Sequence, residues 1–549
     1  MYTELSSKRK KVVLAGILMG MFLGAMTNTT VSTAMPRILT ALGGMEYISW
    51  ALTAYMLTST ISMPIFGKLA DMYGRKPFYI GGIVVFLIGC VLCGTAVNMT
   101  QFIIYRAVAG LGGGVMQSIA MTIIADIFPP AQRGKYQGLM GAVFALSSVI
   151  GPVLGGYVAD HLSWCWVFWI NVPIGFIAIL FLFVGLPKIK LDGNKRIIDY
   201  IGAALLISSF TPMLLAFSWA GKKYPWESEE VIGLLTMSII SLILFIFQEK
   251  RAKEPIIPLS LFKNSVFNVS VITSFLMSMA MFGTIMYVPM FLQGVMGKSA
   301  AGSGIIMPPM MMGLIVASSL SGLLVSKTGK YKRLALFGYA IMSLGIFLMS
   351  FMNAQTTILF IIINLILFGV GMGIVMPIFI VAVQSAFPHK QVGVVTSSVQ
   401  FFRSIGGTFG IALMGTLLNT RFYSEAIRSI PAELIKLIPP DKLSILNSPQ
   451  ALFKSGITGN HLIEQTPGYI SKLIPHLKGA LTVSLHTIFM IGFIISVLAL
   501  VFTFFLKEIP LRKSNKPGLE EAGKELLLED VAAEGGMMPA ESTPDLSEE

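Results

Sequence analysis

Long apolar runs separated by short polar turns cover most of the chain. Roughly 20 helical residues cross the hydrocarbon core of a bilayer, and fourteen runs reach about that length. They start near Val12, Tyr47, Pro77, Gln101, Lys135, Cys165, Ile198, Val231, Val266, Ala301, Leu334, Thr357, Gly393 and Gly479. The pattern predicts an all-α integral membrane protein with fourteen transmembrane helices. An even number of crossings places both termini on one side.

Two parts of the sequence resemble each other. GKLADMYGRK at 67–76 is echoed by GLLVSKTGK at 322–330. Farther along, the matches are Gly110, Gly112 and Gly114 with Gly369, Gly371 and Gly373, Gly134 with Gly393, and Gly151 with Gly410. Internal symmetry of this kind is typical of secondary transporters. We expect two six-helix bundles of the same build, with runs seven and eight inserted between them.

This organisation divides the chain into segments. Residues 1–190 would form the first bundle, 191–260 the inserted pair with its linkers, and 261–510 the second bundle. Within the last segment, residues 420–478 break the rhythm of spans and turns and are expected to form an external loop. Residues 525–549 hold eight acidic residues and no basic one, so 511–549 is expected to be a disordered cytoplasmic tail.

Basic residues are distributed unevenly between the two faces. Hydrophobic residues make up 54% of the chain and charged residues 12%, so lipid must be the solvent for most of it. Up to Lys516, 26 lysines and arginines fall on the N-terminal side, whereas the short connections opposite hold only Arg37, Lys222, Lys223 and Lys298. The positive-inside rule therefore predicts a plasma-membrane protein with both termini in the cytoplasm. The net charge of +13 does not indicate nucleic-acid binding, because the bases are spread over short loops.

Motifs for enzymatic or cofactor chemistry are missing from the sequence. Gly110-x-Gly112 lies inside a hydrophobic run instead of after a soluble strand, so it does not predict a nucleotide-binding loop. No P-loop and no metal-ligand spacing occurs, and all three cysteines fall in apolar runs. We expect neither an enzyme nor a cofactor, and the missing P-loop argues against an ATP-driven pump.

Several motifs resemble those of the major facilitator superfamily, specifically its fourteen-span drug/proton antiporter branch, over roughly residues 10–510. Gly67-x-Leu69-Ala70-Asp71-x-x-Gly74-Arg75-Lys76 resembles the family's signature turn between spans two and three. Arg106-x-x-x-Gly110-x-Gly112 resembles its span-four arginine motif. Other matches are Gly138, Gly151-Pro152 and Gly155-Gly156 in span five, SWAGKKYPW at 218–226, and Gln400-x-x-Arg403-x-x-Gly406-Gly407.

The resemblance implies a major facilitator fold whose two bundles rock around a central cavity. Asp71, Arg75, Asp126 and Arg133 lie in turns on the cytoplasmic face, and the resemblance implies that Arg75 and Asp126 latch an outward-facing state. The alternative is an ordinary solvated ion pair contributing at most about 1 kcal/mol. Further gating or coupling candidates are Arg106, Gly151 and Pro152. For Arg106 the alternative is a structural donor to backbone carbonyls.

One departure from the pattern of this branch bears on proton coupling. The branch usually carries an aspartate in span one shortly before a proline, and Thr27 stands there instead, before Pro36. No Asp or Glu lies deep in any span. Candidates for a proton site are therefore Glu46 and Asp160 near the outer surface, and His486, which titrates near neutral pH. A structural hydrogen bond is the alternative for His486.

Polar residues within the spans are candidates for a substrate cavity. They are Thr27, Asn28, Gln117, Gln293, Asn364, Gln400 and Arg403. The chain also has 34 methionines, whose flexible thioethers adapt to differently shaped ligands, although simple helix packing explains them equally well. Because both deep charges are arginines, we expect a preference for neutral, zwitterionic or anionic lipophiles over permanent cations.

These observations predict a monomeric secondary transporter in the lipid bilayer that exports lipophilic small molecules by proton antiport. A lipid or glycolipid exporter of the same fold is one alternative, which the external loop would serve. A membrane sensor that keeps the fold without net transport is another.

Overall fold

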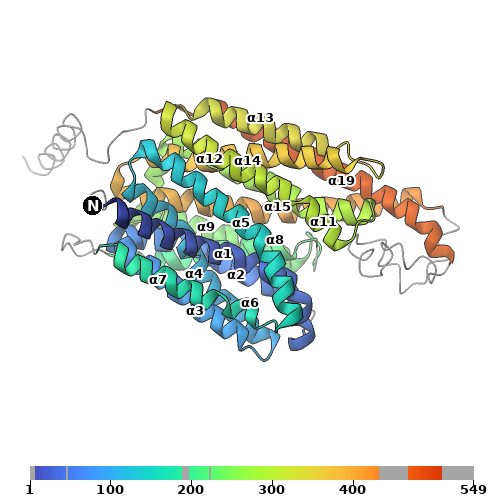
Figure 1. Ribbon diagram of the computed structural model, residues 1–549, viewed down its shortest axis with the longest axis horizontal. Coiled ribbons are helices and arrows are strands. Elements are labelled where there is room, and N and C mark those ends of the chain that lie inside the picture. Colours follow the sequence, from blue (N-terminus) through green and yellow to red (C-terminus); the bar gives the residue numbers. More distant parts are fainter. Residues whose placement is uncertain (1–5, 45–46, 188–196, 222–223, 432–467, 510–549) are drawn as a thin grey trace, which may run out of the picture.

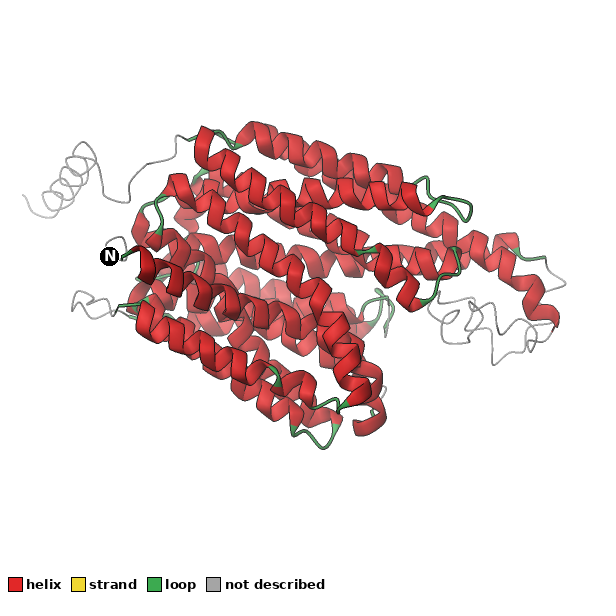
Figure 2. Ribbon diagram, in the orientation of Figure 1, coloured by secondary structure: helices red, strands yellow, loops and turns green. Residues whose placement is uncertain are grey.

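Two helical bundles and an inserted helix pair make up the computed structural model of the chain (Figure 1). It describes residues 6–44, 47–187, 197–221, 224–431 and 468–509. The regular elements within these ranges are helices (Figure 2). Thirteen helical segments there are long and apolar enough to cross a membrane. The 26 residues of α2 (Ile48–Tyr73) are also long enough, which agrees with the predicted fourteen spans.

The first bundle contains six spans. They are α1 (Ser7–Leu42), α2, α3 (Arg75–Gly94), α4 (Met99–Ile127), α5 (Pro130–His161), and α6 (Trp166–Trp169) with α7 (Asn171–Gly185), which share one crossing. Helix α4 packs between α2 and α3, and α1 packs between α5 and α7. A single apolar core fills this bundle, and the ring of Phe102 in it meets the Phe168 ring edge-on at 5.6 Å.

The second bundle repeats this arrangement. Its spans are α10 (Ser265–Met290) with η4 (Phe291–Val295), α11 (Ala300–Ile306) with α12 (Pro308–Thr328), α13 (Lys332–Met349), α14 (Ile358–Ala386), α15 (Val392–Ser429) and α19 (Gly468–Phe504). Short helices η3 (Leu259–Lys263) and η5 (His389–Gln391) precede α10 and α15.

Helix occupies both ends of the segment predicted as an external loop. Helix α15 continues to Ser429, because no helix-breaking residue occurs between Gly415 and Pro431, and α19 already begins at Gly468. The middle of the predicted loop, residues 432–467, and the predicted tail at 511–549 lie outside the described residues.

Glycines at matching positions of the two halves make matching contacts. Helix α4 approaches α2 closely at Gly110, just as α14 approaches α12 at Gly369. Gly112 lies against α3, and its counterpart Gly371 lies against α13. A side chain at any of these positions would overlap the backbone of the neighbouring helix. The sequence repeat therefore corresponds to a repeat of helix contacts.

The inserted pair, α8 (Tyr200–Trp219) and α9 (Glu229–Arg251), packs beside α2 and α15. The turn after α8 contacts the second bundle, where the indole N–H of Trp226 donates to the hydroxyl of Thr416 at 2.6 Å. Gly221 in this turn has φ = 71°, a conformation that favours glycine, and its carbonyl accepts from the Asn419 amide at 3.1 Å. The pair thus lies alongside both bundles.

Candidate functional site

Three charged side chains meet where the two bundles touch. Gly74, with φ = 95°, makes the sharp turn from α2 into α3 and so brings Arg75 back toward Asp71. The guanidinium of Arg75 donates to Asp71 Oδ1 at 2.9 Å through Nη2 and to Asp126 Oδ2 on α4 through Nη1. The side chains of Arg75, Asp71 and Asp126 are 11%, 7% and 2% exposed. Burial to this degree distinguishes the cluster from a solvated surface pair.

The carboxylate of Asp71 also reaches the second bundle. Its Oδ2 accepts a hydrogen bond from the backbone N–H of Val394, at 2.8 Å, in the first turn of α15. Amides in the first turn of a helix lack a partner within that helix, and the helix dipole favours a negative charge there. Asp71 therefore acts as an acceptor for both Arg75 in its own bundle and α15 in the other.

Arg133 and Gln384 form a second link between the bundles. From α5, Arg133 donates to the carbonyls of Ala125 at 2.8 Å and of Gln384 at 3.1 Å, the latter on α14. In return, the side-chain amide of Gln384 donates to the Met121 carbonyl on α4 at 3.3 Å. The buried Gln384 is thus held by the first bundle through both its backbone and its side chain.

Helices α5 and α12 approach each other through small residues at the same end of the interface. A Cβ at Gly134 would lie 2.6 Å from the carbonyl oxygen of Gly322, and one at Gly322 would overlap the backbone of Gly134. One turn farther along, the Ser318 hydroxyl donates to the Gly138 carbonyl at 3.1 Å. Because no large side chain separates them, the two helix backbones pack in direct contact and close this end of the interface.

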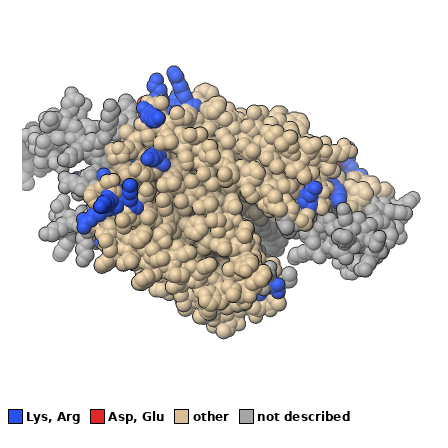
Figure 3. All heavy atoms as spheres, in the orientation of Figure 1, with Lys and Arg blue, Asp and Glu red and all other residues tan. Residues whose placement is uncertain are grey.

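The opposite ends of the bundles are separated. In Figure 1 the helices of the two bundles lie close together at the end where the N-terminus lies and diverge toward the other end. Figure 3 shows a hollow in the surface between the diverging ends. On the face shown, many lysines and arginines gather at the joined end, and others lie at the far end (Figure 3).

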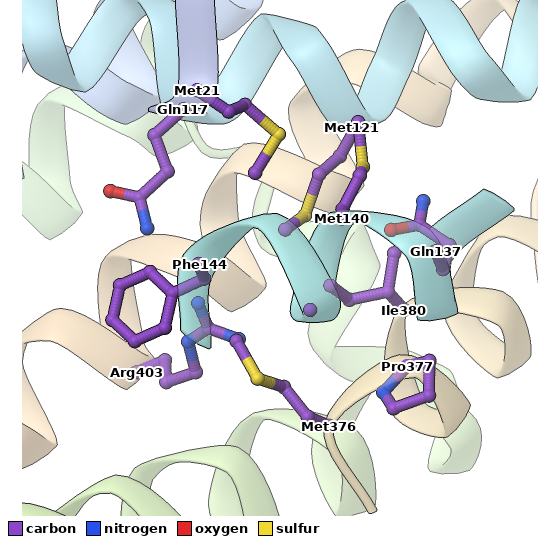
Figure 4. Close-up of a pocket in the computed structure, with 11 residues that line it drawn as sticks. Met21, Gln117, Met121, Gln137, Met140, Phe144, Met376, Pro377, Ile380 and Arg403 are labelled. Atoms are coloured by element: carbon purple, nitrogen blue, oxygen red, sulfur yellow. The ribbon is translucent and has the colours of Figure 1, made fainter. Parts of the chain in front are cut away.

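A pocket lies between the bundles, beside the closed contacts. Its free volume is about 10 Å³, room for about one water molecule, and its lining comes from α1, α4, α5, α14 and α15. The lining residues are Met21, Gln117, Met121, Gln137, Met140, Gly141, Phe144, Met376, Pro377, Ile380 and Arg403. Figure 4 shows Arg403 beside the Phe144 ring and the Met376 thioether. Arg403 is the one charged residue in this lining, which is otherwise apolar with two glutamines.

Comparisons with known proteins agree with this architecture. The family model of the Major Facilitator Superfamily matches residues 17–411. The chain belongs to the major facilitator superfamily. It is 41% identical to the multidrug transporter protein MdtP of Bacillus subtilis, over 96% of this chain and 98% of that protein. It is 36% identical to multidrug resistance protein 3 of the same organism, over 90% and 95% of the two chains.

A solved structure of the family shows the same fold. The proton:xylose symporter XylE, with 6-bromo-6-deoxy-D-glucose bound, superimposes with a TM-score of 0.58 at 15% identity. The match covers 92% of this chain and 97% of the symporter. The predicted fold, two six-helix bundles with an inserted pair, is thereby confirmed.

Arg106 lies inside the first bundle, away from the pocket. Its Nε–H donates to the Ala51 carbonyl on α2 at 3.2 Å, and its guanidinium lies 4.7 Å from the centre of the Tyr55 ring. The Tyr55 hydroxyl donates in turn to the Gly24 carbonyl on α1 at 3.3 Å. These contacts tie three helices together within one bundle, as expected for a donor to backbone carbonyls.

Gly151 and Pro152 lie in the C-terminal half of α5. Gly151 allows α5 to approach Thr29 on α1 closely, because a Cβ there would overlap the Thr29 hydroxyl. Pro152 is half-buried within the same helix. Helix α5 therefore packs closely within the first bundle at Gly151 and against the second bundle at Gly134 and Gly138.

Only two of the predicted cavity residues, Gln117 and Arg403, line the pocket. Thr27 is fully buried and its hydroxyl lies 2.8 Å from the Leu23 carbonyl and 3.2 Å from Asn171 Oδ1, so it faces α7 instead. Asn28 is half-buried on α1. Gln293 lies on η4 and donates to the hydroxyl of Ser303 on α11 at 2.8 Å. Asn364 and Gln400 are buried within the second bundle, and their amide groups have no hydrogen-bond partner in the described ranges.

The proton-site candidates are described in part. His486 is half-buried on α19, and its ring Nε2 donates to the Met352 carbonyl, which follows α13. Glu46 lies outside the described residues, and so does the side chain of Asp160. The buried carboxylates that the structure does place at the bundle interface are Asp71 and Asp126.

Sequence reasoning missed several positions at the interface between the bundles. Gln384 and the Val394 amide carry links between the bundles, and Gln137, Met140 and Phe144 line the pocket. The sequence did hold one signal for Gln384, because this residue precedes Ser385, the counterpart of Asp126 in the repeat. The contact at Val394 uses a backbone N–H, which almost every residue type has, so the amino acid at this position does not indicate it.

Proposed function

We propose that the protein is a secondary active transporter that exports lipophilic compounds by alternating access. The observation that carries the proposal is the pocket lined by both bundles, next to contacts that close one end of their interface. The names of the two Bacillus subtilis relatives, a multidrug transporter and a multidrug resistance protein, support multidrug efflux. The uneven distribution of basic residues supports a cytoplasmic location for both termini and for the closed end, in the plasma membrane.

On this orientation, the structure corresponds to an outward-facing state. Asp71, Arg75 and Asp126 then latch the cytoplasmic end, together with Arg133 and Gln384. Opening that end requires the Asp71–Val394 bond and the Arg133–Gln384 bond to break, since both join the bundles. Such a switch requires only two packed arrangements whose free energies differ by a few kcal/mol.

A proton gradient is the proposed driving force. Glu46, Asp160 and His486 are the candidate proton carriers, and the monomer is the proposed transporting unit. The carboxylates Asp71 and Asp126 are the next candidates, because protonating either would weaken its bond to Arg75.

Transport by purified protein in proteoliposomes tests the proposal. A neutral lipophilic drug is expected to accumulate when a pH gradient is imposed, and to stop accumulating when the gradient is collapsed. The triple variant Glu46→Gln/Asp160→Asn/His486→Gln should lose the dependence on the gradient. Drug movement that does not depend on the pH gradient would contradict proton antiport. A complete lack of drug movement would favour the alternative of a membrane sensor without net transport.

A further inference from the structure

We propose that Arg403 is the recognition point for a single anionic group, such as a carboxylate, on an otherwise lipophilic ligand. This inference rests on the proposed transport function and specifies the substrate class of the same pocket. Arg403 comes eleven residues after the start of α15, which places it about 17 Å into the helix at 1.5 Å per residue. That depth is close to the middle of a hydrocarbon core of about 30 Å.

The guanidinium of Arg403 lacks a counter-ion. In the described part of the chain it forms no hydrogen bond or ion pair, and no acidic residue lines the pocket. An arginine near the middle of the bilayer is unfavourable unless it is paired or faces water. The structure thus keeps an unfavourable charge at the bundle interface without a protein partner for it. An anionic ligand would supply that partner.

The polar neighbours of Arg403 suit the same ligand. Gln137 is 3% exposed and its side-chain NH₂ has no hydrogen-bond partner in the described ranges. Gln117 contributes a second amide to the lining, and Figure 4 shows the two glutamines on different sides of the pocket. Both amides present donors, as a carboxylate requires. A cation would find no carboxylate in this lining.

Methionine side chains form much of the rest of the lining, and they would have to move apart to admit the apolar body of a ligand. Met21, Met121, Met140 and Met376 reach the pocket from α1, α4, α5 and α14, so each bundle supplies thioethers. Flexible methionine side chains repack around different shapes, whereas a guanidinium fixes one polar group in place. Arg403 would thus fix the position of the anionic group, and the methionines would accept ligands of different shape.

Binding measurements in nanodiscs test this assignment. The probes are a fluorescent dansyl-labelled long-chain carboxylic acid, its methyl ester, and a quaternary ammonium compound with the same tail. Wild-type protein should bind the carboxylate at least about tenfold more tightly than the ester, since a hydrogen bond to a charged group is lost. The cation should bind more weakly than the ester. Equal affinity for carboxylate and ester would overturn the anion site and leave the efflux proposal intact.

Three variants locate the effect. Arg403→Gln should abolish the preference for carboxylate over ester, and Arg403→Lys should retain most of it because the charge remains. Arg421→Gln removes an exposed arginine farther along the same helix and should change nothing. A preference that survives in Arg403→Gln would assign it to another residue and refute the proposal.

The same anion chemistry also occurs in lipid headgroups. Binding is therefore compared in nanodiscs of phosphatidylcholine alone and with added phosphatidylglycerol. Competition by phosphatidylglycerol in wild type, but not in Arg403→Gln, would identify a lipid phosphate as the anion that occupies the site. Equal carboxylate affinity in both lipids would identify the free lipophilic anion as its ligand. Efflux of a neutral drug, measured in parallel, reports separately on the proposed function.

Discussion

The carboxylate of Asp71 accepts the backbone N–H of Val394 at 2.8 Å, which joins the end of α2 to the beginning of α15. Its other oxygen is held by Arg75 at 2.9 Å. Gly393 makes this approach possible, because a Cβ at that position would overlap the Asp71 carboxylate. One side chain therefore connects the charge cluster of the first bundle to a helix start in the second, and separation of the bundles at this end must break the connection.

Replacing Asp71 by Asn should reduce transport while leaving the amount of protein in the membrane near normal. Asn keeps an acceptor oxygen for Val394 but removes the charge that strengthens both bonds, each of which contributes about 1.5 to 3 kcal/mol when charged. The arrangement in which this end is closed should therefore be populated less. Drug efflux at matched expression is the measurement.

Glu254→Gln provides the matched control. Glu254 pairs with Lys68 near the same end of α2, but its side chain is 42% exposed, so its loss should cost at most about 1 kcal/mol. Wild-type efflux by Asp71→Asn would rule out the latch, and an equal defect in both variants would indicate a general loss of surface charge instead.

The sequence predicts the fold well because its signals are local and periodic. Spans of apolar residues, and glycines repeated at one offset, correspond directly to crossings and to close helix contacts such as those of Gly110 and Gly369. The cluster of Asp71, Arg75 and Asp126 was also predictable, since its members lie in turns at one end.

The pocket was less predictable, because its lining depends on how far each helix is rotated. Thr27 was assigned to the cavity as a polar residue in span one, but it faces Asn171 within the first bundle. Met21, nearly two turns earlier on the same helix, lines the pocket. With helices that are apolar on nearly all sides, residue type does not distinguish the face toward lipid from the face toward the cavity.

Arg106→Gln should destabilise the protein more than it alters substrate recognition. The side chain donates to Ala51 and stacks over Tyr55 inside the first bundle, contacts that together contribute about 3 kcal/mol. We expect a lower Tm and lower yield, with the KM of the remaining folded protein within about twofold of wild type.

Tyr55→Phe separates the two parts of this contact. It keeps the aromatic ring under Arg106 and removes only the hydroxyl that donates to Gly24 at 3.3 Å, so its Tm should fall less. A large rise in KM for Arg106→Gln without any change in Tm would assign Arg106 to substrate binding instead.

The two ends of α13 should lie on opposite sides of the membrane. Single cysteines are placed at two exposed positions, Arg333 in the first turn of α13 and Gln355 after its end, and are labelled with an impermeant thiol reagent in intact cells. The native half-buried Cys165 is first replaced by Ala to remove background. Gln355→Cys should react directly, and Arg333→Cys only after permeabilisation; the reverse pattern would invert the proposed topology.

Gly322→Ala should hold α5 and α12 apart at the closed end of the interface. The added methyl group would overlap backbone atoms of Gly134, which cannot rotate away as a flexible side chain does. The outward-facing arrangement should lose population to one in which this end is open, and transport should fall because the cycle stalls.

Spin labels at the exposed positions Gln132 and Lys327 should report a longer distance than in the unsubstituted protein. Gly156→Ala, near the C-terminal end of α5 where nothing lies within 4 Å of the new methyl group, should leave distance and transport unchanged. An unchanged distance in Gly322→Ala would show that the helices adjust locally, and the close backbone contact would then not control closure.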